Sequence, residues 1–298
     1  MKYRVLYNPL AGNGHGEENA RLLSFMYNDN QLVYYDMTRI KSYPEFFGGI
    51  YPDDAVIICG GDGTLNRFVN DTEGLHIGND IMYFATGRGN DFLRDLEADT
   101  DNGPVKINKF LESLPVVTVN GMTMRFLNNV GFGMDGYCCE VSDKLREKSN
   151  KPVNYALIAG RGLSGNYKPA NAVVTVDGEK STYRNVWLAS AMNGRYYSGM
   201  MAAPEQDRLN NERLVSIIVL HGTGKLKTLI AFPTLFKGTH VKYKDMVSIF
   251  TGRDITVEFD RPCALQIDGE TVHGVRSYHV TSPGMVIAGE HCLNELIG

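Results

Sequence analysis

An aspartate set among glycines follows an apolar segment in the first quarter of the chain. The segment is Ala55–Cys59 (AVIIC), and Gly60–Asn66 (GGDGTLN) comes directly after it, with Asp62 inside the glycine cluster. An ordinary turn needs one such glycine, whereas several glycines let a ligand approach the backbone N–H groups closely. A carboxylate beside phosphate groups needs a cation between them, and Mg²⁺ is the usual one. The pattern therefore favours phosphoryl transfer over hydride transfer.

Two more glycine-rich segments follow apolar segments in the same way. Residues 8–16 (NPLAGNGHG) come after Tyr3–Tyr7, and residues 86–91 (TGRGND) come after Ile81–Ala85. One such turn is weak evidence, because tight strand-to-helix turns use glycine anyway, but three at one edge of a parallel sheet favour a phosphate site. The segments match neither G-x-x-x-x-G-K-[ST] nor a G-x-G-x-x-G after the first strand, so no Walker-type or dinucleotide site is indicated.

The elements that must position these segments alternate along the first third of the chain. Each predicted strand is followed by a turn and then by a helical pattern, such as Glu17–Tyr27, with acids in its first turn, and residues 42–51, with Ser42 as cap. This repetition predicts a parallel sheet with helices on both faces. We expect residues 1–115 to form a doubly wound α/β nucleotide-binding domain.

The pattern changes after residue 115. Alternating segments joined by two-residue turns predict three hairpins, at Asn120–Gly121, Asp177–Gly178 and Asp268–Gly269. Further strands are predicted at 214–220, 255–259 and 285–289. Only 154–163 and 225–236 have helical patterns, and the second should bend or end near Pro233. We expect residues 116–298 to form a mostly antiparallel β-sandwich, whose extreme carboxyl terminus could pack back on the first domain.

Composition limits the function classes. The chain has 298 residues, 43% hydrophobic and 21% charged, which suits a globular protein of two domains. A net charge of -4 argues against a general nucleic-acid binder. The five cysteines include no CxxC pair, so we expect reduced thiols in a cytoplasm. No apolar run is long enough to span a bilayer, and Asn8–Pro9 interrupts the first one, so we expect peripheral membrane contact only.

Together these motifs resemble the diacylglycerol kinase catalytic superfamily, which includes bacterial soluble lipid kinases and sphingosine kinases. GGDGT alone would be shared with NAD kinases and phosphofructokinases, but the resemblance extends in order over nearly the whole chain. It is carried by Asn8–Gly12, Gly60–Asn66, Gly87–Phe92 (GRGNDF), Val130–Gly136 (VGFGMDG), Asn193–Pro204, Lys237–His240 (KGTH) and Gln266–Glu270 (QIDGE).

The resemblance implies a kinase that uses ATP and Mg²⁺ to phosphorylate the hydroxyl of diacylglycerol or a related lipid in the cleft between two domains. It implies that Asp62 acts through Mg²⁺, that Asp91 and Asp135 belong with it to an acidic, metal-associated network between the domains, and that Glu270 accepts the proton. By position it implies a nucleotide lined by Asn8, Pro9, Ala11, Gly12, Thr38, Gly60, Gly61, Asp62, Gly63, Thr64, Asn66, Gly87, Arg88 and Asn90.

The chemistry of the reaction is consistent with a base at Glu270. An alcohol is a poor nucleophile at neutral pH, and a carboxylate that accepts its proton helps it react. Phosphoryl transfer otherwise needs positioning and charge neutralisation. The pattern alone would make Asp268–Gly269 an ordinary turn and Glu270 a solvated strand residue, so only the resemblance assigns the role.

The sequence also departs from the family pattern. Arg67 stands where glutamate is usual, Arg88 where threonine is usual and Ala85 where proline is usual. We expect Arg67 to form a surface or interdomain ion pair and Arg88 to bind phosphate oxygens. Asn210–Asn211 replaces an Asp-Gly that helps hold a structural Mg²⁺ in bacterial relatives, and a neutral amide is a weaker ligand. The structural metal near Asn210 is therefore in question.

A lipid kinase must also reach its substrate at a membrane surface. Five lysines form local positive patches that anionic headgroups would attract by roughly 1 kcal/mol each, although a solvated face is the plainer interpretation. Tyr196, Tyr197 and the following SGMM could line an acyl pocket or belong to the core. The lysines are Lys225, Lys227, Lys237, Lys242 and Lys244.

Two other functions stay open. An NAD kinase would share GGDGT and the two-domain plan, but the Asn-Glu pair usual in that class is not found. A non-catalytic lipid- or nucleotide-sensing module is suggested by Arg67 and Asn210–Asn211, while retention of the acids at positions 62, 91, 135 and 270 argues against it. The sequence does not decide between a monomer and a homodimer.

Overall fold

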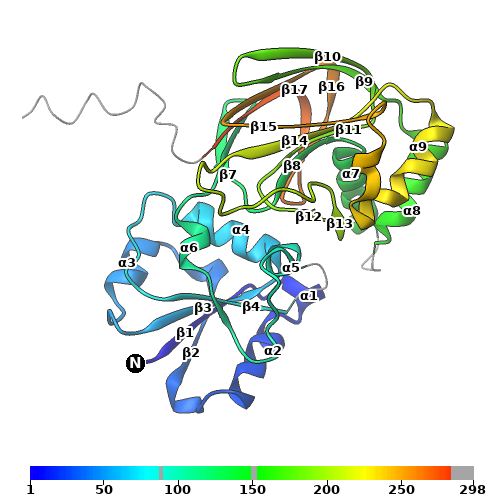
Figure 1. The fold of residues 1–298 in the computed structure, drawn as a ribbon. Coiled ribbons are helices and arrows are strands. Elements are labelled where there is room, and N and C mark those ends of the chain that lie inside the picture. The colour runs from blue at the N-terminus through cyan, green and yellow to red at the C-terminus, as the bar shows by residue number, and fades with distance from the viewer. Residues whose placement is uncertain (87–89, 149–152, 283–298) are drawn as a thin grey trace, which may run out of the picture.

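Five strands form the sheet of the first domain, in the order β2-β1-β3-β4-β5 (Figure 1). This computed structural model describes residues 1–86, 90–148 and 153–282. The first four strands are parallel, as predicted, while the short β5 pairs antiparallel with β4 and was not predicted. The strands are β1 (Tyr3–Tyr7), β2 (Leu32–Asp36), β3 (Ala55–Gly60), β4 (Ile81–Ala85) and β5 (Val105–Lys106).

Helices cover both faces of this sheet, which confirms the doubly wound α/β fold. Because successive side chains of a strand point to opposite faces, Ile57 packs with Ala20 of α2 while Ile58 packs with Phe68 of α4. Ser42 caps α3 by accepting from the Glu45 N–H, as expected. The helices are α1 (Ala11–Gly14), α2 (Gly16–Arg21), α3 (Tyr43–Gly48), α4 (Asp62–Asp71), α5 (Asp91–Asp95) and α6 (Asn108–Leu111), with 3-10 turns η1 (Leu22–Phe25), η2 (Asp29–Gln31) and η3 (Met37–Arg39).

The second domain is built on one large antiparallel sheet. Its order is β15-β14-β11-β8-β16-β17-β6-β7, and β9, which carries β10, also pairs with β16. The strands are β6 (Val116–Val119), β7 (Met122–Arg125), β8 (Asn129–Gly133), β9 (Ala170–Val176), β10 (Glu179–Val186), β11 (Leu188–Met192), β14 (Val215–Leu220), β15 (Val247–Gly252), β16 (Asp254–Ile267) and β17 (Glu270–Thr281), with a separate pair β12 (Tyr196–Tyr197) and β13 (Met200–Met201).

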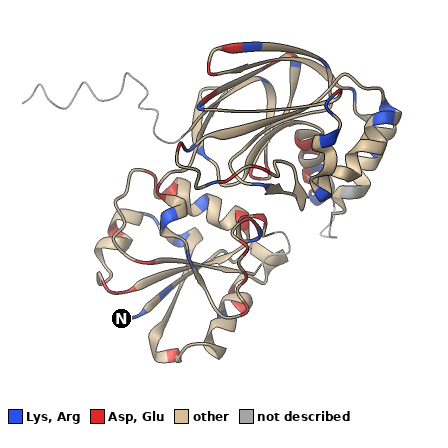
Figure 2. Cartoon of the chain, viewed as in Figure 1, with Lys and Arg blue, Asp and Glu red and all other residues tan. Residues whose placement is uncertain are grey.

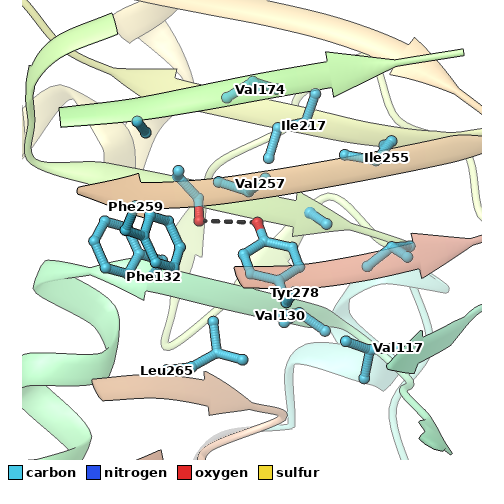
Figure 3. Close-up of a cluster of buried hydrophobic side chains, with 14 of the residues drawn as sticks. Val117, Val130, Phe132, Val174, Ile217, Ile255, Val257, Phe259, Leu265 and Tyr278 are labelled. Atoms are coloured by element: carbon cyan, nitrogen blue, oxygen red, sulfur yellow. Dashed lines mark hydrogen bonds between the residues drawn. The ribbon is translucent and has the colours of Figure 1, made fainter. Parts of the chain in front are cut away.

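The long strand β16 lets this sheet fold over itself. Its first part pairs with β9 and its last part with β8, and its register with β17 shifts between Glu258 and Cys263, around Pro262. A proline cannot donate to the ladder, so it suits such an irregularity. Buried side chains from several strands meet inside the folded sheet. Phe132 of β8 stacks there on Phe259 of β16, and the Tyr278 hydroxyl donates to the Ala189 carbonyl (Figure 3).

All three predicted hairpins form. The first residue of each turn has φ between 46° and 49° and the glycine has φ between 78° and 94°, as two-residue turns with matching twist require. The predicted strand at 285–289 and the predicted return of the carboxyl terminus lie outside the described residues.

Helices α7 (Met134–Arg146), α8 (Tyr155–Arg161) and α9 (Lys225–Ala231) gather at one end of the second sheet (Figure 1). The structure confirms α8 and α9, and α9 changes to a 3-10 helix just before Pro233. Helix α7 was not predicted, since its first turn carries glycine and reads as a loop. A Cβ at Gly136 would lie 2.0 Å from the Ala264 carbonyl oxygen, so glycine lets α7 pack directly on β16. The short helices nearby are η4 (Gly162–Asn166), η5 (Phe232–Lys237) and η6 (Thr239–Lys242).

Within the described part of the chain, no helix has the length and apolar character needed to cross a bilayer.

Candidate active site

The carboxyl ends of four parallel strands bring the predicted nucleotide segments to one edge of the first sheet. Thr38 follows β2, Asn8 to Gly12 follow β1, Gly60 to Thr64 follow β3, and Asn90 comes before α5. This edge is where open parallel sheets bind ligands. Thr38 is exposed, and its N–H and hydroxyl both donate to Asp36 Oδ1, at 2.9 and 2.6 Å. The predicted contacts of Gly87 and Arg88 lie outside the described residues.

The turn from β3 to α4 brings backbone close to the edge. A Cβ at Gly60 would lie 2.4 Å from Thr64 Oγ1, so only glycine lets the strand end that close to the first turn of α4. The N-cap of α4 is Gly61, which has no side chain to accept a cap hydrogen bond. N–H groups at such a helix start lack intrahelical partners and can bind anions.

Asp62 is the half-buried carboxylate at the start of α4. It accepts hydrogen bonds from Asn128 Nδ2 at 3.0 Å, from the Phe92 N–H at 3.2 Å and from the Tyr83 hydroxyl at 3.4 Å. Burial, with the negative charge of Asp91, raises the pKa of Asp62 to about 7. A negative charge is therefore costly at this position, and a bound cation would stabilise it.

The three acids predicted to be metal-associated are held in different ways. Asp91 is buried and accepts from the Gly199 N–H at 3.1 Å. Asp135 is buried and accepts from the Ser190 hydroxyl at 2.5 Å and the Tyr197 hydroxyl at 2.7 Å, and burial raises its pKa to about 7. Over residues 1–86, 90–148 and 153–282, no three His, Cys, Asp or Glu side chains form a group that could hold a metal ion. Each oxygen of Asp135 already accepts from a hydroxyl group, and the metal association of the three acids stays a prediction.

Asp268 is a half-buried acid whose role the sequence did not predict. Its carboxylate accepts from the N–H groups of Leu127, Asn128 and Asn129 at 2.5, 2.8 and 3.0 Å, and burial raises its pKa. Asn66 of α4 also donates to it, at 2.7 Å, so this predicted nucleotide residue uses its amide to join the two domains. The Asp-Gly turn concealed the role, since Asp is common there for conformational reasons alone.

Glu270 stands two residues beyond Asp268, at the start of β17. The β16–β17 hairpin reaches toward α4 of the first domain (Figure 1), so Glu270 belongs to the second domain but lies next to the interdomain contact. Its side chain is exposed, and its strand β17 lies beside α7, where the Thr271 hydroxyl donates to Asp143 Oδ2 at 2.6 Å. Asp268 thereby fixes the turn that carries Glu270.

An apolar cavity of about 180 Å³ opens beside Asp135. Tyr197, Ser198 and Met200 line it, which agrees with the expectation of a pocket at this run, whereas Tyr196 is buried under the Arg94 guanidinium instead. The other lining residues are Met134, Asp135, Cys138, Cys139, Tyr155, Ala159, Phe232, Phe236 and Gln266.

Asp95 of α5 anchors the two domains to each other. Its Oδ1 accepts from Arg195 Nε at 2.9 Å and its Oδ2 from Arg208 Nε at 2.5 Å. The buried Arg208 guanidinium also donates to the Leu127 carbonyl and to Asn128 Oδ1, each at 3.1 Å. No motif pointed to these arginines, because only the fold brings them to α5.

Two of the departures from the family pattern, Arg67 and Asn210, have local explanations. Arg67 is exposed and pairs with Asp71 on the same helix, with 3.3 Å between Nε and Oδ2, which confirms the expected surface ion pair. The Asn210 amide donates to the carbonyls of Asp207 and Leu214 and accepts from the Leu214 N–H. Its carbonyl oxygen is thus used within its own loop.

Comparison with known proteins agrees with this architecture. Residues 2–119 match the model of the diacylglycerol kinase catalytic domain, and residues 128–287 match that of the YegS C-terminal NAD kinase beta sandwich-like domain. The chain belongs to the diacylglycerol kinase catalytic superfamily. It is a lipid kinase-like phosphotransferase by family.

Three individual proteins illustrate the similarity. The Bacillus subtilis protein YtlR, named as a candidate lipid kinase, is 27% identical over 76% of this chain and 77% of its own. The diacylglycerol kinase of Mycobacterium tuberculosis H37Rv is 26% identical over 69% of this chain and 67% of its own. A Bacillus anthracis structure described as a diacylglycerol kinase aligns with a TM-score of 0.58 at 20% identity, over 95% of this chain and 94% of that one, and shows the same fold.

Proposed function

We propose that this protein transfers the γ-phosphate of ATP to the hydroxyl of diacylglycerol or a related lipid, with Mg²⁺. The observation that carries the proposal is the arrangement of two domains around one edge. The glycine-rich edge with Asp62 lies on the first domain, and the second domain brings Glu270 and an apolar cavity to it. The phosphates would lie at the glycine-rich edge, the lipid hydroxyl would lie near Glu270, and the acyl chain would enter the apolar cavity.

The residues present fit a magnesium ion. Mg²⁺ is usually bound by one or two carboxylates together with substrate phosphates rather than by a complete protein cage. Asp62 accepts from the N–H of Phe92, the residue after Asp91, so these two carboxylates would supply such a partial site. The ion would neutralise charge on the phosphates when bound.

The side chains of this chain would divide the remaining work. Backbone N–H groups at Gly60 to Gly63 would hold phosphate oxygens. Glu270 would take the proton from the lipid hydroxyl as its oxygen bonds to the γ-phosphorus, while the bond to the departing ADP oxygen breaks. The hydrogen bonds of Asp268 and Asn66 keep the hairpin of Glu270 against α4 during this step.

The test is a transfer assay with Glu270→Gln. We expect label from γ-labelled ATP in one lipid of a detergent-dispersed panel of diacylglycerol, monoacylglycerol, ceramide, sphingoid base, undecaprenol and phosphatidylglycerol. Glu270→Gln should lower kcat by about 10² to 10⁴ because the general base is lost, while ATP affinity stays near that of the parent protein.

Glu258→Gln is the matched control, since Glu258 is an exposed glutamate on the same hairpin. Full activity of Glu270→Gln would remove Glu270 as the base. Label in NAD rather than in any lipid would replace the proposed function with NAD phosphorylation.

A further inference from the structure

Helix α9 has its large apolar side chains on the outside. Thr228 and Ala231 are buried, while Leu226, Leu229 and Ile230 are 72%, 48% and 63% exposed. A helix on the surface of a globular protein normally does the reverse and turns its largest apolar residues toward the core. The Thr228 hydroxyl bonds to that of Thr223 at 2.6 Å, so the inward face of α9 is anchored by small polar contacts. The outward face is left to contact something else.

Neighbouring elements extend this apolar face. Phe236 of η5 is 43% exposed and Leu157 of α8 is 52% exposed. Helix α9 contacts η4, the continuation of α8, and Figure 1 shows α8 and α9 side by side. Contiguous exposed apolar groups of this kind mark interaction sites. We call Leu157, Leu226, Leu229, Ile230 and Phe236 the α9 surface.

The segments that carry the α9 surface are rich in lysine. Residues 225–244 contain five lysines and no acid, and residues 148–176 also contain no acid, although the whole chain has a net charge of -4. Lys225, Lys227, Lys237, Lys242 and Lys244 are exposed, and none forms an ion pair with any residue the structure describes. Figure 2 shows blue segments on α9. Apolar side chains on the same helix as the exposed Lys225 and Lys227 match an anionic bilayer, which offers acyl chains below its charged headgroups.

The apolar cavity borders this surface at Phe236. Phe236 of η5 and Tyr155 of α8 line the cavity that contains Asp135, and both are also partly exposed, Tyr155 by 37%. Phe236 thus belongs both to the α9 surface and to the wall of the cavity that Asp135 also lines. A dissolved ligand would need no such apolar surround.

We propose that the α9 surface docks this protein on anionic membranes, with Leu226, Leu229 and Ile230 inserted among the acyl chains and the lysines on the headgroups. The use of the cavity as a lipid entrance rests on the proposed function, but docking itself requires neither ATP nor turnover.

Co-sedimentation with vesicles tests the docking. We expect the full chain to bind phosphatidylcholine vesicles containing phosphatidylglycerol at least tenfold more tightly than vesicles of phosphatidylcholine alone. Leu226→Gln, Leu229→Gln and Ile230→Gln combined should weaken binding at least tenfold. Lys225→Gln with Lys227→Gln should weaken binding to the anionic vesicles only, by about fivefold for each lysine, and added salt should reproduce the loss.

A second exposed apolar cluster supplies the matched control. Leu22, Phe25 and Met26, near η1, are 46%, 87% and 44% exposed but follow Glu17 and Glu18. Changing these three to Gln should leave vesicle binding unchanged, and all variants should keep the parent's thermal midpoint because the side chains are exposed. Equal loss in both triple variants, or equal binding to neutral and anionic vesicles, would overturn the proposal.

Two further outcomes separate the alternatives. If the parent chain is a dimer without vesicles and the α9 triple variant is a monomer, with no vesicle binding by either, the surface joins two copies of the chain and the membrane proposal fails. If the vesicle results are as expected but no lipid is phosphorylated, docking stands and the proposed function fails.

Discussion

Acids of the same type have different properties at this interface because their surroundings differ. Asp268 has four donors around it, Asp135 has two hydroxyl groups and Asp62 has weaker contacts and a negative neighbour. Glu270 is exposed and free of such bonds among the described residues. Acids with several donors hold structure, whereas Glu270 has no such role and suits the proposed one of proton acceptor.

Asp135→Asn should change how stability depends on pH. The pKa of Asp135 is about 7 in the folded protein and near 3.8 in the unfolded chain, so between pH 4 and 7 the native state holds a proton that the unfolded state has lost. The parent therefore loses stability as pH rises through this range, and asparagine, which does not titrate, does not. In urea unfolding, the free energy of unfolding of the variant should rise relative to that of the parent by at most about 1.4 kcal/mol per pH unit, up to pH 7.

The exposed Asp101→Asn is the control for this comparison. A stability difference between Asp135→Asn and the parent that is the same at pH 5 and pH 8 would show that Asp135 is ionised when folded.

At the scale of elements, local signals predicted most of the fold. Asn-Gly and Asp-Gly turns placed three hairpins because their conformation is set by two residues. Helix α7 was missed because its start is chosen by packing of Gly136 on β16, a contact distant in sequence. The predicted nucleotide edge was inferred from glycine-rich segments after β1, β3 and β4. The role of Asp268 was not, since its donors lie about 140 positions earlier in the chain.

The β16–β17 hairpin should depend on the Asp268 carboxylate. Asp268→Asn replaces one acceptor oxygen with an amide that faces backbone N–H groups, so at least one buried donor loses its partner. We expect the free energy of unfolding to fall by about 2–4 kcal/mol, because each unsatisfied buried group costs about 1–3 kcal/mol. Kinase activity should fall as well, since the same turn carries Glu270.

Asp177→Asn is a closely matched control. Asp177 has the same place in the β9–β10 turn and accepts from the N–H groups of Arg253 and Asp254, but these contacts are exposed. Asp177→Asn should lower the free energy of unfolding by less than about 1 kcal/mol and leave activity unchanged. Equal costs in the two hairpins would show that the interdomain position of Asp268 adds nothing.

For the whole molecule, what matters is how the two domains are held at the edge that both contribute to. Their contacts are mostly polar: Asn66 to Asp268, Asn128 to Asp62, Gly199 to Asp91, and Arg195 with Arg208 to Asp95. Such bonds fix direction, so they set where Glu270 stands relative to Asp62. Sequence patterns cannot reveal them, because each partner has an ordinary identity in its own segment.

Arg208→Met should loosen this interface. The buried guanidinium bonds to Asp95, Leu127 and Asn128 and lies over the Phe92 ring, so its loss leaves a buried carboxylate with one cationic partner fewer. Breaking such a pair costs about 3–5 kcal/mol, and urea unfolding should show it. Arg253→Met, at an exposed arginine, should cost less than about 0.5 kcal/mol.

Chelation completes this test. Arg208 supplies positive charge between the domains, and the Asn210 amide is satisfied within its own loop, so the fold itself should not need a structural Mg²⁺. EDTA should leave the unfolding midpoint of the parent unchanged while it abolishes transfer from ATP. A midpoint that falls with EDTA in the parent and not in Arg208→Met would instead mean that a cation at this interface acts together with the guanidinium.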